Sequence, residues 1–326
     1  MRILLENGNS NIWNSEIKVS EIIYSIINDG KVTIDLNSEG PCCEDIGLYR
    51  ILDHICHKFS FPKSSVTIET ANALESHDEY IIVKKTLGHY LGLIKDGLKE
   101  NINIDKNFSD YTYKSFGIFV RRPSWERIWI SSDLWKNYPD KVYGTFHWEI
   151  DSEFHLTHTT LTDLLNFSKN LNTVVDACEF LKTTPYEVES FSISSDYRYC
   201  DLLKFYKNFF LEIVVETYFS GNTFFPTEKT WRSVATKTPF IIHGPVDFLK
   251  NFKKLGFRTF DKWWSEEYDD YGHEERIRKI LDLTHEIANY STNELCNIYK
   301  DMSGVLEHNF ELFNKITNDD FKKEFG

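Results

Sequence analysis

The fold of this chain is decided by residues 211–244, which read LEIVVETYFSGNTFFPTEKTWRSVATKTPFIIHG. The apolar, β-branched run Leu211–Val215 predicts a strand that is buried on both faces. Residues 220–226 carry turn signals, and Thr227 is placed to cap a helix that ends before the Lys-Thr-Pro sequence. Residues 240–243, FIIH, predict a second buried strand. The stretch therefore predicts a strand–loop–helix–strand unit of a parallel sheet.

Polar side chains of this unit follow the strands or open the helix. We expect Glu216 and His243 at the ends of the two strands, and Thr227, Glu228 and Lys229 at the start of the helix. Ligands of open α/β sheets bind at the carboxyl ends of strands. A helix N-terminus also offers free N–H groups and a partial positive charge to a phosphate. The sequence therefore predicts a phosphate site at this edge.

A second informative stretch is residues 117–127, GIFVRRPSWER, where a strand leads through a turn into a helix. Arg121, Arg122 and Arg127 surround that turn. Each guanidinium can bond two oxygens, so the three predict a clamp for a diphosphate. The alternative is that Arg127 and Glu126 form a solvated helix face and that Arg121 bridges two domains.

The alternation of strands and helices continues on both sides of these stretches. Strands are predicted near residues 2–5, 31–36, 65–70, 80–83, 115–120, 141–146 and 258–260. Helices are predicted near residues 16–27, 46–59, from 86, 125–135, 160–171, 173–181, 246–255, 274–290 and 293–316. Residues 101–107 are polar and lack periodicity. We therefore expect an α/β protein of two Rossmann-like domains facing a cleft, residues 1–110 and 111–326.

The composition excludes several classes of protein. The 326 residues carry a net charge of −13, which repels nucleic acid because such binding depends largely on neutralising phosphates. The sequence contains no run of 18 uncharged apolar residues, so it predicts no membrane span. The six cysteines form no C-x-x-C pair, which favours free thiols in a reducing compartment. We expect a cytoplasmic protein, in the host cell if the source is viral.

The sequence Thr227-Glu228-Lys229, its amphipathic helix, the Pro-Phe-Ile-Ile strand and the Gly-Pro turn resemble the donor-site core of α1,3-fucosyltransferases. They are also similar to exostosin-like and viral or phage glycosyltransferases. The resemblance covers about residues 114–280 and is weak before them.

The arginine-rich turn extends this resemblance. Arg121, Arg122 and Arg127 match the N-R-R-P-x-x-H-R element of the family. At two positions the sequence departs from the family, since Val120 stands in place of the family's Asn and Glu126 in place of its His.

The resemblance implies a GT-B glycosyltransferase that moves a sugar from a nucleotide diphosphate, such as a GDP- or UDP-sugar, to a hydroxyl acceptor. It places the donor on the second domain and the acceptor, a glycan or another hydroxyl compound, on the first. It assigns Glu228 to the ribose hydroxyls and Lys229 to the phosphates, and it favours inversion. Fixed cations at the diphosphate stabilise the leaving group as its charge grows, so Lys229 is also a catalytic candidate.

The roles of the remaining candidates are open from the sequence. Glu216 either contacts the hydroxyls of the donor sugar or caps a loop, and His243 either approaches the same site or is a buried structural histidine. The general base for an inverting transfer is assigned to Glu39, with Asp45 and Glu69 as rivals, since a carboxylate in a dry cleft can have a raised pKa.

No metal or other cofactor is expected. Asp269 and Asp270 do not form a D-x-D motif and predict a solvated loop. His54 and His57 have metal-ligand spacing on a predicted helix but lack a third ligand in the sequence. Arg232, one turn after Glu228, is expected to pair with it.

Two other functions fit the pattern. One is sugar transfer to a hydroxymethylated pyrimidine in DNA, against which the negative charge argues. The other is a non-catalytic module that binds a nucleotide or a glycan on the same scaffold, because a fold does not determine an activity.

Overall fold

The computed structural model describes residues 2–4, 16–36, 40–98, 105–110, 113–120, 123–146, 158–184, 186–187 and 202–326. The chain forms two compact units. Unit 1 comprises Met1–His89, Tyr218–Pro226 and Ile316–Gly326, and unit 2 comprises Tyr90–Thr217 and Thr227–Lys315. The units thus interleave along the chain, whereas the sequence predicted one division after residue 110, which stays a prediction.

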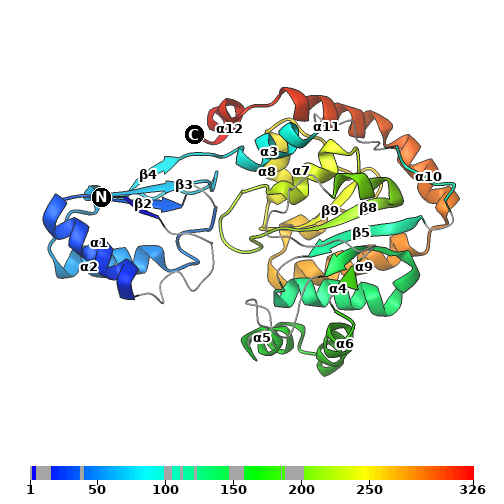
Figure 1. The fold of residues 1–326 in the computed structure, drawn as a ribbon, viewed down its shortest axis with the longest axis horizontal. Helices are drawn as coiled ribbons and strands as arrows, with labels where there is room; N and C mark the ends of the chain where they lie inside the picture. Colours follow the sequence, from blue (N-terminus) through cyan, green and yellow to red (C-terminus); the bar gives the residue numbers. More distant parts are fainter. Residues whose placement is uncertain are drawn as a thin grey trace. The chain divides into compact units, whose positions relative to one another are not determined.

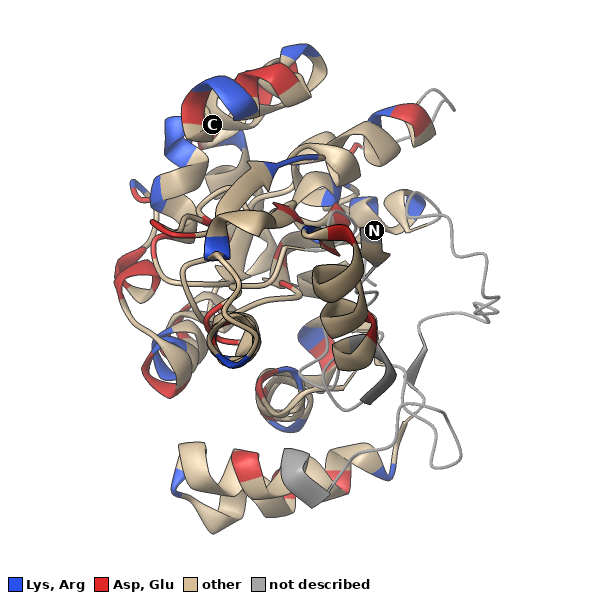
Figure 2. Ribbon diagram, turned by 90° about the vertical axis from the view of Figure 1, so that its left-hand side faces the viewer, with Lys and Arg blue, Asp and Glu red and all other residues tan. Residues whose placement is uncertain are grey.

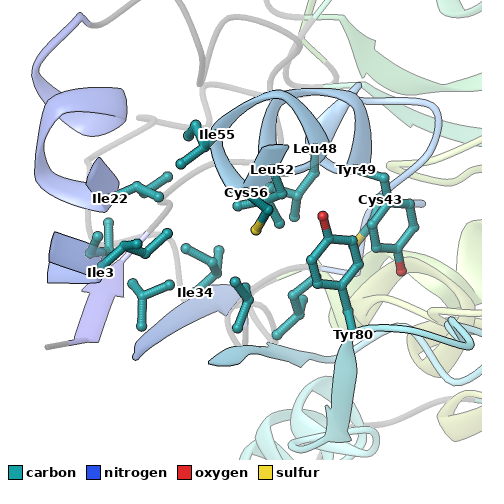
Figure 3. Close-up of a cluster of buried hydrophobic side chains, with 14 of the residues drawn as sticks. Ile3, Ile22, Ile34, Cys43, Leu48, Tyr49, Leu52, Ile55, Cys56 and Tyr80 are labelled. Carbon is teal, nitrogen blue, oxygen red and sulfur yellow. The ribbon is translucent and has the colours of Figure 1, made fainter. Parts of the chain in front are cut away.

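Unit 1 contains a parallel sheet of four strands in chain order (Figure 1). Its strands are β1 (Arg2–Leu4), β2 (Val32–Leu36), β3 (Val66–Thr70) and β4 (Ile81–Lys84). Alternate residues of β2 and β3 enter one core together with apolar residues of α1 (Glu16–Asp29) and α2 (Leu48–Lys58). Figure 3 shows Ile22, Leu48, Leu52 and Ile55 of these helices pointing toward the strands. The parallel connections β1–α1–β2–α2–β3 therefore place both helices on the same face of the sheet.

Two distant segments complete unit 1. Asn72, just after β3, donates from Nδ2 to the carbonyl of Asn222 at 2.9 Å and accepts from the backbone N of Phe224 at 3.0 Å. Ala73 N donates to the carbonyl of Phe224 at 3.1 Å. The C-terminal helix α12 (Asn318–Phe325) is held through Gly88 N, which donates to Asn318 Oδ1 at 3.0 Å.

Unit 2 contains a sheet in the order β7-β6-β5-β8-β9, in which only β7 runs antiparallel to its neighbour. The strands are β5 (Lys114–Val120), β6 (Val142–Phe146), β7 (Tyr186–Glu187), β8 (Phe209–Val215) and β9 (Phe240–His243). Every residue of β6, β8 and β9 is buried, which confirms the burial predicted for residues 211–215 and 240–243. The chain is a mixed α/β protein with parallel sheets, consistent with the Rossmann-like type, which confirms the α/β part of the predicted fold class. The arrangement of two domains facing a cleft stays a prediction.

Helices cover both faces of this second sheet. Figure 1 shows α7 and α8 on one side and α4 and α9 on the other. The helices of this part are α3 (His89–Gly97), α4 (Trp125–Asn137), α5 (His158–Ser168), α6 (Leu171–Leu181), α7 (Glu228–Ala235), α8 (Phe248–Lys254), α9 (His273–Ala288), α10 (Thr292–Asp301) and α11 (Ser303–Lys315). None of the described helices is long and apolar enough to cross a membrane.

Two predictions near the C-terminus were wrong. Residues 258–260 do not form a strand, because the amide of Asn309 bonds both the N and the O of Arg258 at 2.8 Å and takes the place of a neighbouring strand. The helix predicted over residues 293–316 is interrupted at Met302, whose side chain is fully buried and which separates α10 from α11.

The close approach of β6 to β5 gives a test of this fold. Gly144 pairs with Ile118, and a Cβ at Gly144 would lie 2.0 Å from the carbonyl oxygen of Ile118. Because that oxygen belongs to the backbone of a central strand, we expect Gly144→Ala to lower the free energy of unfolding by about 3 kcal/mol. Urea denaturation measures the change. The control Gly92→Ala, on an exposed helix position with open space, should gain about 0.5–1 kcal/mol. An unchanged stability of Gly144→Ala would contradict the strand pairing.

Candidate functional site

The centre of the unit 2 sheet has a topological switch point. Strands β5 and β8 are neighbours, yet the chain leaves β5 through α4 to β6 on one side and leaves β8 through α7 to β9 on the other. Open α/β sheets bind ligands outside the carboxyl ends of the strands at such a reversal. The two stretches singled out in the sequence, residues 117–127 and 211–244, contribute these two strands and the segments that follow them.

Glu216 follows β8 and bonds the start of α7. Its side chain is 2% exposed, and Oε1 accepts from Thr227 N at 3.1 Å and from Thr230 Oγ1 at 2.6 Å. Oε2 accepts from Thr227 Oγ1 at 2.5 Å and from Thr217 N at 3.3 Å. The carboxylate therefore joins the end of β8 to the N-terminus of α7. This geometry favours the capping role of Glu216 over contact with a donor sugar.

Lys229 lies at the same helix start, as the sequence predicted. Its Nζ is 3.2 Å from Thr217 Oγ1, from Thr227 Oγ1 and from Glu228 Oε1. The side chains of Lys229 and Glu228 are 15% and 14% exposed. Burial raises the pKa of Glu228, but the charges of Lys229 and Arg232 outweigh it and the net pKa is lowered. The first turn of α7 therefore holds an ionised carboxylate beside an ammonium group.

Arg127 reaches the carboxyl end of β8 from α4. Its Nη2 donates to the carbonyl oxygen of Glu216 at 2.8 Å. Arg127, one arginine of the predicted clamp, thus contacts Glu216, and Glu216 in turn bonds Thr227 at the start of α7. Arg121 and Arg122 lie outside the described residues, so the rest of the predicted clamp stays a prediction.

His243 ends β9 at the same edge, where its carbonyl accepts from Glu216 N at 2.9 Å. Its side chain is 1% exposed. Burial first, and then the positive charges of Arg276, Arg127 and His273, hold the pKa of His243 well below its usual range. His243 is therefore neutral near pH 7 and lies close enough to Arg127 to sense its charge.

Glu126 is the residue whose role the sequence did not reveal. A solvated face of α4 was one reading of this position, yet the side chain is 0% exposed. Neither carboxyl oxygen of Glu126 has a hydrogen bond to a described residue, and neither does the buried hydroxyl of Ser124 at the N-cap of α4. Burial raises the pKa of Glu126 to about 8, and the neighbouring Ser124 and the charge of Arg127 oppose this rise. A neutral, buried carboxyl group therefore stands at the first turn of α4.

Arg232 has a different environment from the one predicted. Its Nε donates to the hydroxyl of Tyr206 at 2.9 Å, and its guanidinium lies 4.0 Å from Glu212 on β8. The ion pair within 4.0 Å is thus with Glu212, although the charge of Glu228 is also felt at Arg232. Because Arg232 is 4% exposed, it anchors α7 on the sheet.

The candidates for the general base lie in unit 1. Glu39, the first choice, lies outside the described residues. Of its rivals, Asp45 is exposed, whereas Glu69 is 9% exposed and pairs with Lys85 at 2.5 Å. An ion pair holds a carboxylate in its charged form, so Glu69 fits the role of a base with a raised pKa less well.

The acidic pair near the C-terminus has a structural role. Asp269 is 6% exposed, and its Oδ2 accepts from Leu249 N at 2.9 Å and from Lys250 N at 3.2 Å at the start of α8. The prediction of a solvated loop was therefore wrong for Asp269. His54 and His57 are both exposed on α2. Within the described ranges no three His, Cys, Asp or Glu side chains are grouped to hold a metal ion.

Comparisons with family models, with curated proteins and with solved structures found no match to this chain.

The raised pKa of Glu126 has a consequence for stability. Between pH 4.5 and about 8 the unfolded chain loses this proton and the folded chain keeps it, so folding becomes less favourable as the pH rises. We expect the free energy of unfolding of the wild type, relative to Glu126→Gln, to fall by about 1.4 kcal/mol per pH unit in this window. Urea denaturation at several pH values measures it. Parallel pH profiles of the two proteins would show that Glu126 is ionised in the folded state.

The four hydrogen bonds that Glu216 accepts make a measurable contribution to the free energy of unfolding. Glu216→Ala leaves the N and Oγ1 of Thr227 without their acceptor in a buried position, so we expect a loss of about 3 kcal/mol in the free energy of unfolding. Glu216→Gln keeps an acceptor and should lose about 1 kcal/mol. The exposed control Glu275→Ala should change stability by less than about 0.5 kcal/mol. Equal stabilities of Glu216→Ala and Glu275→Ala would show that Glu216 does not anchor α7.

Proposed function

We propose that this protein is a glycosyltransferase that moves a sugar from a nucleotide diphosphate to a hydroxyl acceptor. The observation that carries the proposal is the switch point of unit 2, where Arg127 from α4 and Lys229 from α7 flank the end of β8. An anion binds where a helix start and fixed cations come together. The donor diphosphate is assigned to this edge, with Arg121 and Arg122 as further ligands from the sequence.

The described residues suit the leaving group of such a transfer. Lys229 bonds the hydroxyls of Thr217 and Thr227 and pairs with the carboxylate of Glu228, and a phosphate oxygen can replace the two neutral hydroxyls as acceptors of its ammonium protons. Nη2 of Arg127 donates to the carbonyl of Glu216, which holds the guanidinium charge at the end of β8. Positive charge held at the diphosphate stabilises the negative charge that grows as the sugar leaves.

The nucleoside is assigned to Glu228. Its carboxylate stays ionised, since its pKa is lowered, and an ionised carboxylate is an acceptor for ribose hydroxyls. His243 is buried and its lowered pKa keeps it neutral, so we assign it a structural role and not the role of a charged ligand contact.

The complete proposal includes the GT-B arrangement, with the acceptor on the first domain and inversion at the sugar. Glu39 remains the proposed base, with Asp45, which is exposed, and Glu69, which is paired with Lys85, as its rivals. No metal or organic cofactor is assigned a role.

Transfer to DNA is less well supported. The net charge is −13, and Figure 2 shows Lys and Arg interspersed with Asp and Glu along the described helices. A duplex-binding face requires clustered cations. The alternative function, a non-catalytic module that binds a nucleotide, would use the same site. Release of nucleoside diphosphate distinguishes a transferase from such a module.

Donor binding tests the site. Thermal shift with GDP, UDP, ADP, CMP and their sugars should identify at least one ligand, because a ligand at 100 times its Kd stabilises the folded state by about 2.7 kcal/mol. Lys229→Ala should lower the affinity for that ligand by about 10- to 100-fold, since the substitution removes a charge-assisted hydrogen bond. Lys237→Ala, whose side chain pairs with Glu307, is the matched control and should bind normally. Normal affinity in a stable Lys229→Ala protein would refute the site, whereas binding without release of nucleoside diphosphate would leave the non-catalytic module.

A further inference from the structure

Helices α1 and α2 of unit 1 border an open apolar groove with a cavity volume of about 510 Å³. Its apolar lining comes from Val19 and Ile23 of α1 and from Ile51, Ile55 and Phe59 in and after α2. The volume lies within the range of about 300–1,000 Å³ that is usual for ligand sites. The groove involves none of the residues that carry the proposed glycosyl transfer.

One edge of the groove is basic. Arg50, His54 and Lys58 line it, all three are exposed, and none of them pairs with an acidic group among the described residues. By contrast, the nearby Lys63 pairs with Asp53 at 2.8 Å. In a chain with a net charge of −13, Arg50 and Lys58 without an acidic partner in the described part of the chain, with His54 between them, are a specific feature.

The opposite edge continues the apolar surface. Ile27 lies one turn after Ile23 on α1, and its side chain is 58% exposed. Val19, Ile23 and Ile27 therefore form an apolar stripe at the spacing i, i+4, i+8. Arg50, His54 and Lys58 follow the same spacing on α2. Each stripe extends about 12 Å, which is two helical turns.

We propose that this groove docks an acidic amphipathic helix of a partner protein. The apolar side of that helix covers the Val19–Ile23–Ile27 stripe, and its carboxylates, spaced one turn apart, face Arg50, His54 and Lys58. A helix supplies several anionic groups at this spacing, whereas an amphiphile with a single head group uses only one of the three basic residues. Helix-in-groove recognition has the same pattern of anchors at i, i+4 and i+7 or i+8.

A synthetic peptide pair tests the proposal with the full chain. The probe is an amphipathic peptide about 20 residues long, because shorter isolated helices are marginal in water, with Leu on one side and Glu at a spacing of four along one flank. The matched peptide has Gln in place of Glu. Fluorescence anisotropy measures the affinity of each. The Glu peptide should bind about tenfold more tightly, and this preference should shrink with added salt.

Variants then locate the binding. Arg50→Glu/Lys58→Glu should abolish the preference for the Glu peptide, and Ile27→Lys should weaken both peptides by about tenfold, with unchanged thermal stability as the control for folding. Equal affinity for the two peptides, or an unchanged preference in the double variant, would overturn the proposal. Preferential binding to phosphatidylserine vesicles that depends on Arg50 and Lys58, without preference for the Glu peptide, would overturn it in favour of a membrane surface.

Discussion

The carboxylate of Glu216 is the contact on which the candidate site depends. It is buried, and it accepts from the backbone and side chain at the start of α7 while its own carbonyl accepts from Arg127. One residue thereby sets the end of β8, the first turn of α7 and the position of α4. A buried carboxyl group needs such donors, because polar oxygens without hydrogen bonds are costly to bury. Lys229 and Glu228 take their positions from the helix start that Glu216 holds.

The same loop has a second structural role. Residues 218–226 leave unit 2 after Thr217, belong to unit 1 through Asn72, and return to unit 2 at Thr227. A segment between a strand and its following helix is thus used as a structural part of the other unit. The side chain of Asn72 holds this segment with one donor and one acceptor, which match the C=O of Asn222 and the N–H of Phe224.

Buried polar groups distinguish the residues with a structural role from the candidates for binding. Glu216 and Arg232 bond partners within unit 2 and so hold helices in place, and Oδ2 of Asp269 does the same, whereas Oδ1 of Asp269 has no hydrogen bond among the described residues. Glu126 differs, since its carboxyl oxygens have no hydrogen bond among the described residues and its pKa is raised to about 8. A group of that kind costs stability, and such costs are concentrated at sites that function.

The sequence by itself determined most of the elements and their type. The predicted strands at residues 211–215 and 240–243 are buried because both faces of a parallel sheet are covered. Thr227 begins a helix because its hydroxyl caps it. Only the tertiary structure decided the partners of each polar side chain. Glu126 and Asp269 read as solvated from local pattern, and Asn309 replaces a predicted strand, because burial and pairing depend on residues distant in the chain. Hydrophobic periodicity carries information about one element at a time, whereas hydrogen-bond satisfaction is settled by all the elements packed together.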